Sequence, residues 1–390
     1  MHRVRSLTRV SSLAAILWAV FATVGFSCRG TESQEAARPS SLTPVWFTDA
    51  SFSAGWVGRP AVVGNLVIFG AHYGLAAFDT QTGKLAWRAK LWSLEWDAVA
   101  KNVATAEGRG CIADNLLIGC IDVASGRVLW TTLLDSSAAY VESDYYKGTW
   151  FYGGKDHTVH ALDPADGSER WAVDVAPGAK YSTRVYGVTV RGDTVYATTV
   201  RWITATGLPV VGDLVALNRN TGSLYWKYTT PGTKGGFQGR ALLTDKLAIV
   251  NDAYAHSLLG IDLQTGTEVW RTTKDDRGFL SSESTPVLVG DTVFAASADT
   301  QIYAIDARTG GLLWRVYGDG DALGGIDVCP HTLIALEFAG GRPVLVDRKT
   351  HRVMPLDALS PEKSISSRFA VSGNRAYAAG TGGVYAFECD

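Results

Sequence analysis

Short apolar or alternating runs, separated by Gly, Asn, Asp and Thr-Gly pairs, recur along most of the chain. The first set is PAVVG, LVIFGA, LAAFDT and KLAWRA, between residues 60 and 89. Runs this short, bounded by turn residues, are typical of β-strands rather than of helices. The pattern therefore predicts an all-β chain in which four short strands follow one another.

The last two runs of this set form a motif that returns along the chain. LAAFDTQTGKLAWRA at 75–89 is followed by GCIDVASGRVLW (119–130), HALDPADGSERW (160–171), VALNRNTGSLYW (215–226), LGIDLQTGTEVW (259–270) and YAIDARTGGLLW (303–314). The acid position steps by 43, 41, 55, 44 and 44 residues. Weaker copies are VLVDRKTHRVMP (344–355) and VYAFECD (384–390). A fixed period of this size is the signature of a repeat architecture.

Four strands in each unit of about 43 residues predict one blade of a β-propeller. The last copy ends just after its acid position, and Trp46 stands 41 residues before Trp87 with no turn segment ahead of it. The sequence therefore predicts an eight-bladed β-propeller of four-stranded antiparallel blades, in which an N-terminal strand completes the last blade.

The repeated residues have structural roles in this prediction. The acid accepts backbone N–H bonds in the turn, the glycine takes a positive φ angle, and the tryptophan packs against a neighbouring blade. The alternative, a ligand-binding role, is weaker because each buried tryptophan contributes about 4–6 kcal/mol, which is comparable with the net stability of a whole domain. The acids are Asp79, Asp122, Asp163, Asp262 and Asp306; the glycines are Gly83, Gly126, Gly167, Gly222, Gly266 and Gly310; the tryptophans are Trp87, Trp130, Trp171, Trp226, Trp270 and Trp314.

The N-terminus differs from the repeats. Arg3, Arg5 and Arg9 precede an apolar run at 13–27, Cys28 follows, and a polar stretch continues from residue 29. This arrangement resembles a bacterial lipoprotein signal with Cys28 as the lipidated residue. We therefore expect a signal peptide at 1–28, a polar tether at 29–44 and the propeller at 45–390. Plain secretion and an uncleaved anchor remain open, and all three alternatives export the propeller.

Export places the other cysteines in an oxidising compartment. If the chain turns around residues 115–116, Cys111 and Cys120 face each other in a non-hydrogen-bonded pair, whose spacing suits a disulfide. The alternative is a buried free thiol at Cys120, because other units have a small residue there. Whether Cys329 and Cys389 pair is open.

Charge and composition narrow the choice of partners. The chain has 36 basic and 38 acidic residues, and no Lys/Arg-rich run interrupts the repeats. We therefore expect no nucleic-acid partner.

The connections between units differ from copy to copy, and in a propeller they share one face. They contain aromatic and arginine residues, the types enriched at binding hot spots. We predict a candidate binding face there, with packing beneath the loops as the alternative. Its residues are Trp56, Trp92, Trp96, Tyr140, Tyr145, Arg184, Phe237, Arg240, Arg277 and Arg368. The fourth unit has about 12 extra residues around 200–213, which predict a longer hairpin.

The motif A-x-D-x-x-T-G-K-x-x-W, complete at 77–87, resembles the repeat of PQQ-like, quinoprotein-type β-propellers. That family includes dehydrogenases that bind pyrroloquinoline quinone (PQQ) and the outer-membrane assembly lipoprotein BamB, which is closest in build. The dehydrogenases have adjacent cysteines over the quinone, a Ca²⁺ site and an aspartate base. This chain has no adjacent cysteines, and no catalytic residue can be carried over to it.

The resemblance to BamB implies a non-catalytic, monomeric envelope scaffold that binds a protein partner. We expect it at the periplasmic side of the outer membrane or another extracytoplasmic surface, attached to the membrane through a lipid anchor only. No cofactor and no metal are expected. The alternative is a propeller that binds a carbohydrate, or PQQ with calcium, including a quinoprotein oxidoreductase.

Overall fold

The structure is a computed structural model of the whole chain. It describes residues 44–50, 58–71, 74–91, 102–113, 117–134, 142–178, 182–202, 209–232, 235–272, 285–317, 323–337, 343–355 and 364–389. The chain divides into two units, 1–38 and 39–390, and every described residue lies in the second. None of the described segments forms a helix with the length and apolar character that a membrane span requires.

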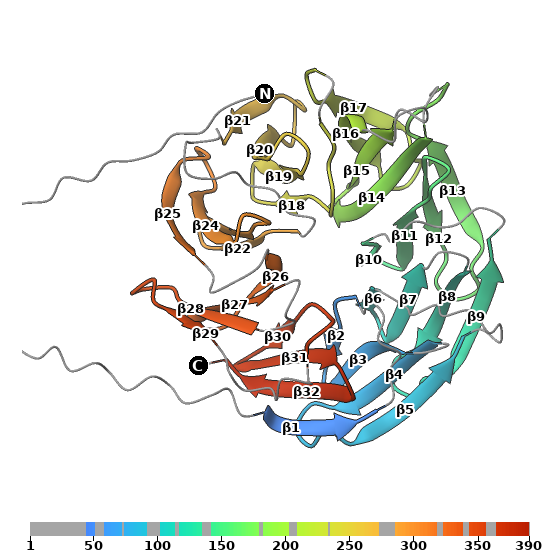
Figure 1. Cartoon of the computed structure of the whole chain (residues 1–390). Coiled ribbons are helices and arrows are strands. Elements are labelled where there is room, and N and C mark those ends of the chain that lie inside the picture. The colour runs from blue at the N-terminus through green and yellow to red at the C-terminus, as the bar shows by residue number, and fades with distance from the viewer. Residues whose placement is uncertain are drawn as a thin grey trace, which may run out of the picture. The chain divides into compact units, whose positions relative to one another are not determined.

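The described strands form eight antiparallel sheets of four, which are the blades of a propeller (Figure 1). Blade 1 contains β2 (Ala61–Val63), β3 (Leu66–Ala71), β4 (Gly74–Asp79) and β5 (Leu85–Lys90). Blade 2 contains β6 (Val103–Ala106), β7 (Arg109–Ala113), β8 (Leu117–Asp122) and β9 (Val128–Leu133). Blade 3 contains β10 (Asp144–Tyr146), β11 (Thr149–Gly153), β12 (Thr158–Leu162) and β13 (Glu169–Asp174). Blade 4 contains β14 (Ser182–Arg191), β15 (Thr194–Trp202), β16 (Pro209–Asn218) and β17 (Leu224–Thr229).

The second half of the chain forms the other blades in the same order. Blade 5 contains β18 (Leu242–Leu243), β19 (Leu247–Asp252), β20 (Ser257–Asp262) and β21 (Glu268–Arg271). Blade 6 contains β22 (Val287–Val289), β23 (Thr292–Ala296), β24 (Gln301–Asp306) and β25 (Leu312–Tyr317). Blade 7 contains β26 (Leu323–Val328), β27 (Thr332–Glu337), β28 (Pro343–Asp347) and β29 (Val353–Pro355). Blade 8 contains β30 (Ala370–Ser372), β31 (Arg375–Gly380), β32 (Gly383–Glu388) and β1 (Pro44–Asp49).

The two ends of the propeller meet in blade 8. Strand β1 pairs antiparallel with β32, and Trp46 lies opposite Ala386 (Figure 1). The predicted closure by an N-terminal strand is therefore confirmed. Because the first strand completes the last sheet, the hydrogen bonds of this pairing hold the two ends of the propeller together.

Tryptophans join one blade to the next along the outer wall. Trp87 Nε1 donates a hydrogen bond of 2.9 Å to the carbonyl oxygen of Val123, the residue after the turn acid of blade 2. Five other tryptophans donate in the same way to the residue after the next blade's turn acid or asparagine: Trp46 to Thr80, Trp130 to Pro164, Trp171 to Arg219, Trp226 to Leu263 and Trp270 to Ala307. These seams therefore combine apolar packing with one specific polar bond.

The turn glycine allows this packing. Gly126 has a φ angle of 71°, and a Cβ atom there would lie 2.5 Å from the Trp87 ring of the preceding blade. Asp122 closes the same turn, because its Oδ1 accepts the N–H of Ser125 at 2.9 Å. An L side chain in place of Gly126 would be strained and would also displace the tryptophan.

The seams on either side of blade 7 are built differently. Trp314 stacks on His351, which replaces the usual glycine, with ring centroids 4.3 Å apart. Pro355 stands where other blades have the tryptophan, and a disulfide between Cys329 and Cys389 joins blade 7 to the end of blade 8. The Cys389 carbonyl, which is in the acceptor position of the other seams, accepts a hydrogen bond of 2.7 Å from Thr332 Oγ1.

A second disulfide lies inside blade 2. Cys111 and Cys120 are directly opposite each other on β7 and β8, their Cα atoms are 4.1 Å apart, and the two sulfur atoms are joined. This bond reinforces one hairpin, whereas the Cys329–Cys389 bond spans 60 residues.

Candidate functional site at the propeller axis

The innermost strands surround a cavity of about 740 Å³ on the propeller axis. The blade sequences can be aligned without gaps on the turn that follows each inner strand. The residues that flank this turn pair with each other, as Val63 does with Leu66 in blade 1 and Val289 with Thr292 in blade 6. One position of this alignment lies four residues before the first of the two flanking residues, just before the inner strand in six blades and within the longer strands β14 and β26 in blades 4 and 7. From blade 1 to blade 8 it holds Arg59, Asn102, Glu142, Gly187, Arg240, Thr285, Gly325 and Arg368, which we call the axial ring.

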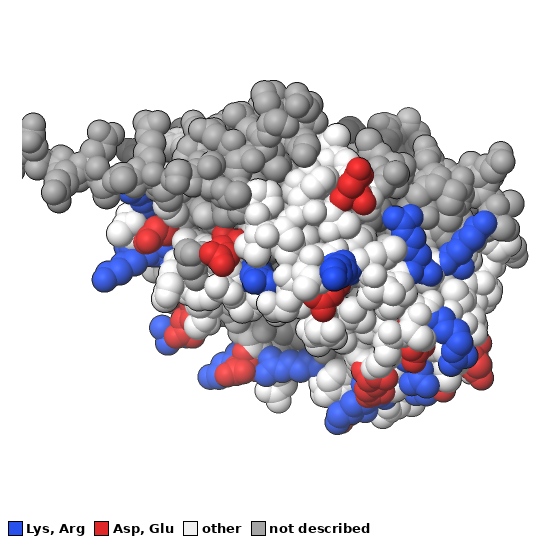
Figure 2. Space-filling view, turned by 90° about the horizontal axis from the view of Figure 1, so that it is seen from below, with Lys and Arg blue, Asp and Glu red and all other residues white. Residues whose placement is uncertain are grey.

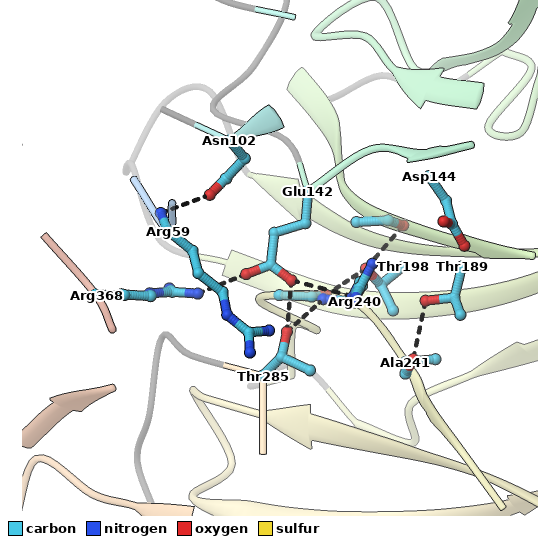
Figure 3. Close-up of polar contacts among 12 residues, drawn as sticks. Arg59, Asn102, Glu142, Asp144, Thr189, Thr198, Arg240, Ala241, Thr285 and Arg368 are labelled. Atoms are coloured by element: carbon cyan, nitrogen blue, oxygen red, sulfur yellow. Dashed lines mark hydrogen bonds and ion pairs between the residues drawn. The ribbon is translucent and has the colours of Figure 1, made fainter. Parts of the chain in front are cut away.

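Glu142 is the central residue of the axial ring. Its carboxylate accepts a hydrogen bond from Arg368 Nη1 and another, of 2.7 Å, from Thr285 Oγ1. Arg240 Nε is 3.6 Å from the same carboxylate (Figure 3). These partners come from blades 8, 6 and 5, whereas Glu142 precedes the inner strand of blade 3. The Glu142 side chain therefore links parts of the ring that are far apart in the sequence.

The backbone of Glu142 is fixed separately from its side chain. Its N–H donates to the Tyr186 carbonyl at 3.2 Å, and its carbonyl accepts the N–H of Val188 at 2.8 Å. A short parallel bridge to Gly187 thus attaches blade 3 to blade 4. These bonds do not involve the carboxylate, so a change of this side chain leaves the backbone attachment in place.

The environment keeps Glu142 ionised. Burial favours the neutral acid, but the positive charges of Arg368 and Arg240 and the hydroxyl of Thr285 outweigh it, and the pKa falls to about 2. At neutral pH the site therefore contains a carboxylate between two guanidinium groups.

Two glycines of the axial ring make room for the arginines. A Cβ atom on Gly187 would lie 2.4 Å from Cα of Arg240, and one on Gly325 would lie 3.2 Å from Cγ of Arg368. Each glycine belongs to the blade that precedes the arginine. Arg240 and Arg368 therefore fit because the neighbouring blade has a glycine at the same position.

A second ion pair crosses the wall of the cavity. Arg59 Nη2 is 2.5 Å from Asp327 Oδ2, and Arg59 Nε donates to the carbonyl of Phe369. The Arg59 N–H donates to Oδ1 of Asn102 (Figure 3). Burial raises the pKa of Asp327, and the charge of Arg59 partly offsets that effect.

Asp144 lies on β10 next to the axial ring. It accepts the N–H of Val190 at 2.8 Å (Figure 3 shows the residue beside the ring). Burial raises the pKa of Asp144, and this hydrogen bond partly opposes the rise. The carboxylate is therefore bound to backbone rather than offered to the cavity.

The described residues that line the cavity include four arginines, Arg59, Arg191, Arg240 and Arg368, and two carboxylates, Glu142 and Asp327. The formal difference is two positive charges, four minus two. Arg191 pairs with Asp245 outside the lining, which leaves three arginines against two carboxylates and an excess of one positive charge. By contrast, Figure 2 shows blue and red residues interspersed on the side of the molecule that it presents.

The structure separates the residues that sequence patterns assigned to a binding face. Arg240 and Arg368 line the axial cavity together. Tyr145 and Phe237 are buried, with exposed fractions of 6% and 0%, so the prediction that they form an exposed face is corrected. Tyr145 belongs to a core cluster between blades 2 and 3, and Phe237 to one between blades 4 and 5.

Other predicted residues fall elsewhere. Arg184 is half-buried on β14 opposite Val200 and does not line the cavity. Trp56, Trp92, Trp96, Tyr140, Arg277 and Cys28 lie outside the described residues. In blade 4 the predicted long hairpin exists as β15 and β16, and the Trp202 ring meets Tyr254 edge to face.

Sequence reasoning missed Arg59, Glu142, Thr285 and Asp327. Arg59, Glu142 and Thr285 could have been found from the repeat alignment. They occupy one aligned position that varies between Arg, Asn, Glu, Gly and Thr, while the turn motif stays nearly constant. Asp327 lies two positions further along its blade.

The described residues of the axial cavity do not offer the ligand set of a calcium ion that would accompany a quinone. Within the described segments, no group of three or more His, Cys, Asp or Glu side chains could hold a metal ion. Glu142 and Asp327 are both ion-paired with arginines. Calcium requires six to eight oxygen ligands, and these two carboxylates, both bound to arginines, do not supply them.

The architecture and repeat define the class of protein, a PQQ-like β-propeller. A family model described as outer membrane protein assembly factor BamB matches residues 36–147, 74–199 and 155–320. The chain belongs to this family.

Relatives include both outer membrane protein assembly factors and dehydrogenases. BamB of Bordetella pertussis (strain Tohama I) is 20% identical over 344 residues, which cover 75% of this chain and 83% of that protein. A polyvinylalcohol dehydrogenase of Sphingopyxis sp. (strain 113P3) is 26% identical over 188 residues, 42% of this chain. The match spans only 26% of that enzyme's length.

A solved structure supports the fold. BamB from Moraxella catarrhalis superposes with a TM-score of 0.66 at 17% identity, covering 88% of this chain and 98% of that one. At this identity the likeness establishes the propeller and leaves its role to the residues of the site.

Proposed function

We propose that this protein is a non-catalytic scaffold of the cell envelope, which binds a protein partner in outer-membrane protein assembly. The observation that carries the proposal is the axial ring, in which arginines from two blades, Arg240 and Arg368, hold the carboxylate of Glu142 from a third blade. Arginine is enriched at protein–protein hot spots because its planar group makes several hydrogen bonds at once.

The extent of the similarities supports the same choice. The alignment with Bordetella pertussis BamB covers most of both proteins, whereas the dehydrogenase alignment covers about a quarter of the enzyme. The lipoprotein-like N-terminus fits a protein held at a membrane surface, and we propose Cys28 as the lipidated residue. Labelling cells with a radioactive fatty acid tests this part: the wild-type chain should be labelled, and Cys28→Ser should not.

Surface plasmon resonance with the full-length chain tests the scaffold function. The analyte is the purified barrel subunit of the outer-membrane assembly machinery from the same organism. We expect saturable binding in the micromolar range or tighter, as is usual for a specific transient interface. No binding at high micromolar concentrations would overturn the proposal.

A quinoprotein dehydrogenase is the second candidate, because a polyvinylalcohol dehydrogenase is among the relatives. Incubation of the chain with PQQ and Ca²⁺, followed by dye reduction with polyvinyl alcohol or short alcohols, tests it. We expect no turnover above that of heat-denatured protein. Quinone-dependent oxidation would replace the scaffold proposal with an enzymatic one.

A further inference from the structure

The axial ring contains a complete carboxylate-binding site. The donors around the Glu142 carboxylate are the guanidinium groups of Arg368 and Arg240 and the hydroxyl of Thr285. Charge-assisted bonds from guanidinium groups are among the strongest and most geometrically specific bonds to a carboxylate. The donors come from three blades, and Glu142 comes from a fourth.

The backbone of Arg240 and the hydroxyl of Thr285 are held by a bond that does not involve the Glu142 side chain. The N–H of Arg240 donates to Oγ1 of Thr285 at 3.1 Å, so the two donors are tied to each other. Gly187 and Gly325 leave the space that the two arginines occupy. The backbone positions from which Arg240 and Thr285 reach the site, and the space that the arginines fill, therefore do not depend on Glu142.

The site also lies where an outside group can reach it. The side chains of Arg368, Arg240 and Glu142 are 30%, 34% and 17% exposed, respectively. All three line the axial cavity, and a third arginine, Arg59, bonds to the carbonyl of the residue after Arg368. A concave site with this excess of positive charge attracts anions.

We infer that the axial ring is an exchangeable carboxylate site, in which an acidic side chain of the partner displaces Glu142 from Arg240 and Arg368. Glu142 is then an internal competitor that occupies the site until the partner arrives. The inference rests on the proposed function, because it names the chemistry of the partner segment. A small free dicarboxylate offers the same chemistry and is distinguished below.

The test measures binding of a fluorescent oligo-aspartate peptide to the full-length chain by anisotropy at low salt. Glu142→Gln removes the competing charge and keeps the side-chain size, so we expect about tenfold tighter binding, equivalent to about 1.4 kcal/mol. Arg368→Gln and Arg240→Gln should each weaken binding by about tenfold or more. An oligo-asparagine peptide should not bind.

Matched controls change the same charges away from the axis. Glu388→Gln replaces an exposed glutamate of β32, and Arg308→Gln replaces an arginine that is 73% exposed on a blade 6 turn. Both should alter affinity by less than about twofold. If Arg368→Gln unfolds, Arg368→Lys keeps the charge but loses the planar fork, and it should weaken binding while melting near the wild-type temperature.

Several outcomes would overturn the inference. Unchanged or weaker peptide binding by a folded Glu142→Gln variant would show that Glu142 does not compete. Succinate that binds as tightly as the peptide would keep the carboxylate site but overturn a partner segment as its source. If the assembly barrel subunit binds the Glu142→Gln and Arg368→Gln variants as it binds wild type, the inference fails and the scaffold function stands.

Discussion

The outer wall and the axis of this propeller use the same repeat in opposite ways. On the wall, an acid, a glycine and a tryptophan recur from blade to blade, and six seams contain the same tryptophan-to-carbonyl bond. At the axis, the aligned position holds five different residue types in eight blades. A position with the same residue type in most blades thus indicates a shared packing role, whereas a position with different residue types indicates where an individual site can form.

The largest expected effect comes from opening the wall. Deletion of residues 42–50 removes β1 and Trp46, and leaves the edge of β32 unpaired. We expect a loss on the order of 5 kcal/mol or more, because a buried tryptophan alone contributes about 4–6 kcal/mol. The melting temperature should fall by about 10 °C or more. Deletion of residues 30–38, in the polar segment, is the control and should change it little.

A single wall tryptophan should have the next effect. Trp87→Ala removes a side chain that is 9% exposed and its bond to Val123, so we expect a loss of about 3–5 kcal/mol. Leu133→Ala, on the equivalent outer strand of blade 2, changes a residue that is 63% exposed and should cost less than about 0.5 kcal/mol. Chemical denaturation measures both. Equal losses would contradict the structural role assigned to the wall.

The two disulfides should differ in their contribution to stability. They close segments of 60 and 9 residues, and a longer closed loop restricts the unfolded chain more. Replacing Cys329 and Cys389 by serine should cost about 4 kcal/mol, and replacing Cys111 and Cys120 about 2.5 kcal/mol. The reverse order in denaturation experiments would show that native contacts, rather than loop length, dominate. The longer bond lies at the seam where Pro355 replaces the tryptophan.

The axis should matter less for stability than for binding. Glu142→Gln removes an ion pair whose arginines remain about one-third exposed, so water can solvate them. We expect a loss of only about 1 kcal/mol, after allowing for this solvent screening. A loss as large as that of Trp87→Ala would show that the axial ring is a structural element like the wall.

The smallest effect concerns pH. His160 on β12 lies between Asp156 and Glu169, and although its burial lowers the pKa, hydrogen bonds to these two acids raise it above 6.5 overall. Its contribution to stability is therefore fully present below about pH 6.5, and it is lost as the pH rises through the folded-state pKa. Between pH 6 and 9, the free energy of unfolding of wild type should fall with rising pH by an amount that the His160→Gln variant does not lose. Melting curves across this range compare them.

The turn acids should add nothing to that pH dependence. Hydrogen bonds from Thr82 hold the pKa of Asp79 below 3.8, and Asp122 and Asp306 are lowered in the same way by Ser125 and Thr309. Their contribution is lost only as the pH falls through these lowered values, which lies outside the range tested above.

The sequence was informative about the candidate site only in part. It selected Arg240 and Arg368 because arginines in variable connections often bind, but the same rule also selected Phe237, whose ring is buried. Residue type alone does not distinguish a side chain under a connection from one that lines the axis. Glu142 was not selected because a single acid has no local pattern, and its partners lie as far as 226 residues away.

The amino-acid sequence by itself determined the number of blades, the four strands in each and the closure by the first strand. It could do so because those features depend on local turns and apolar periodicity, which repeat. Only the tertiary structure decided which variable positions meet at the axis. Each blade contributes one residue there, and closure of the ring brings Glu142 of blade 3 together with Arg240, Thr285 and Arg368 of blades 5, 6 and 8.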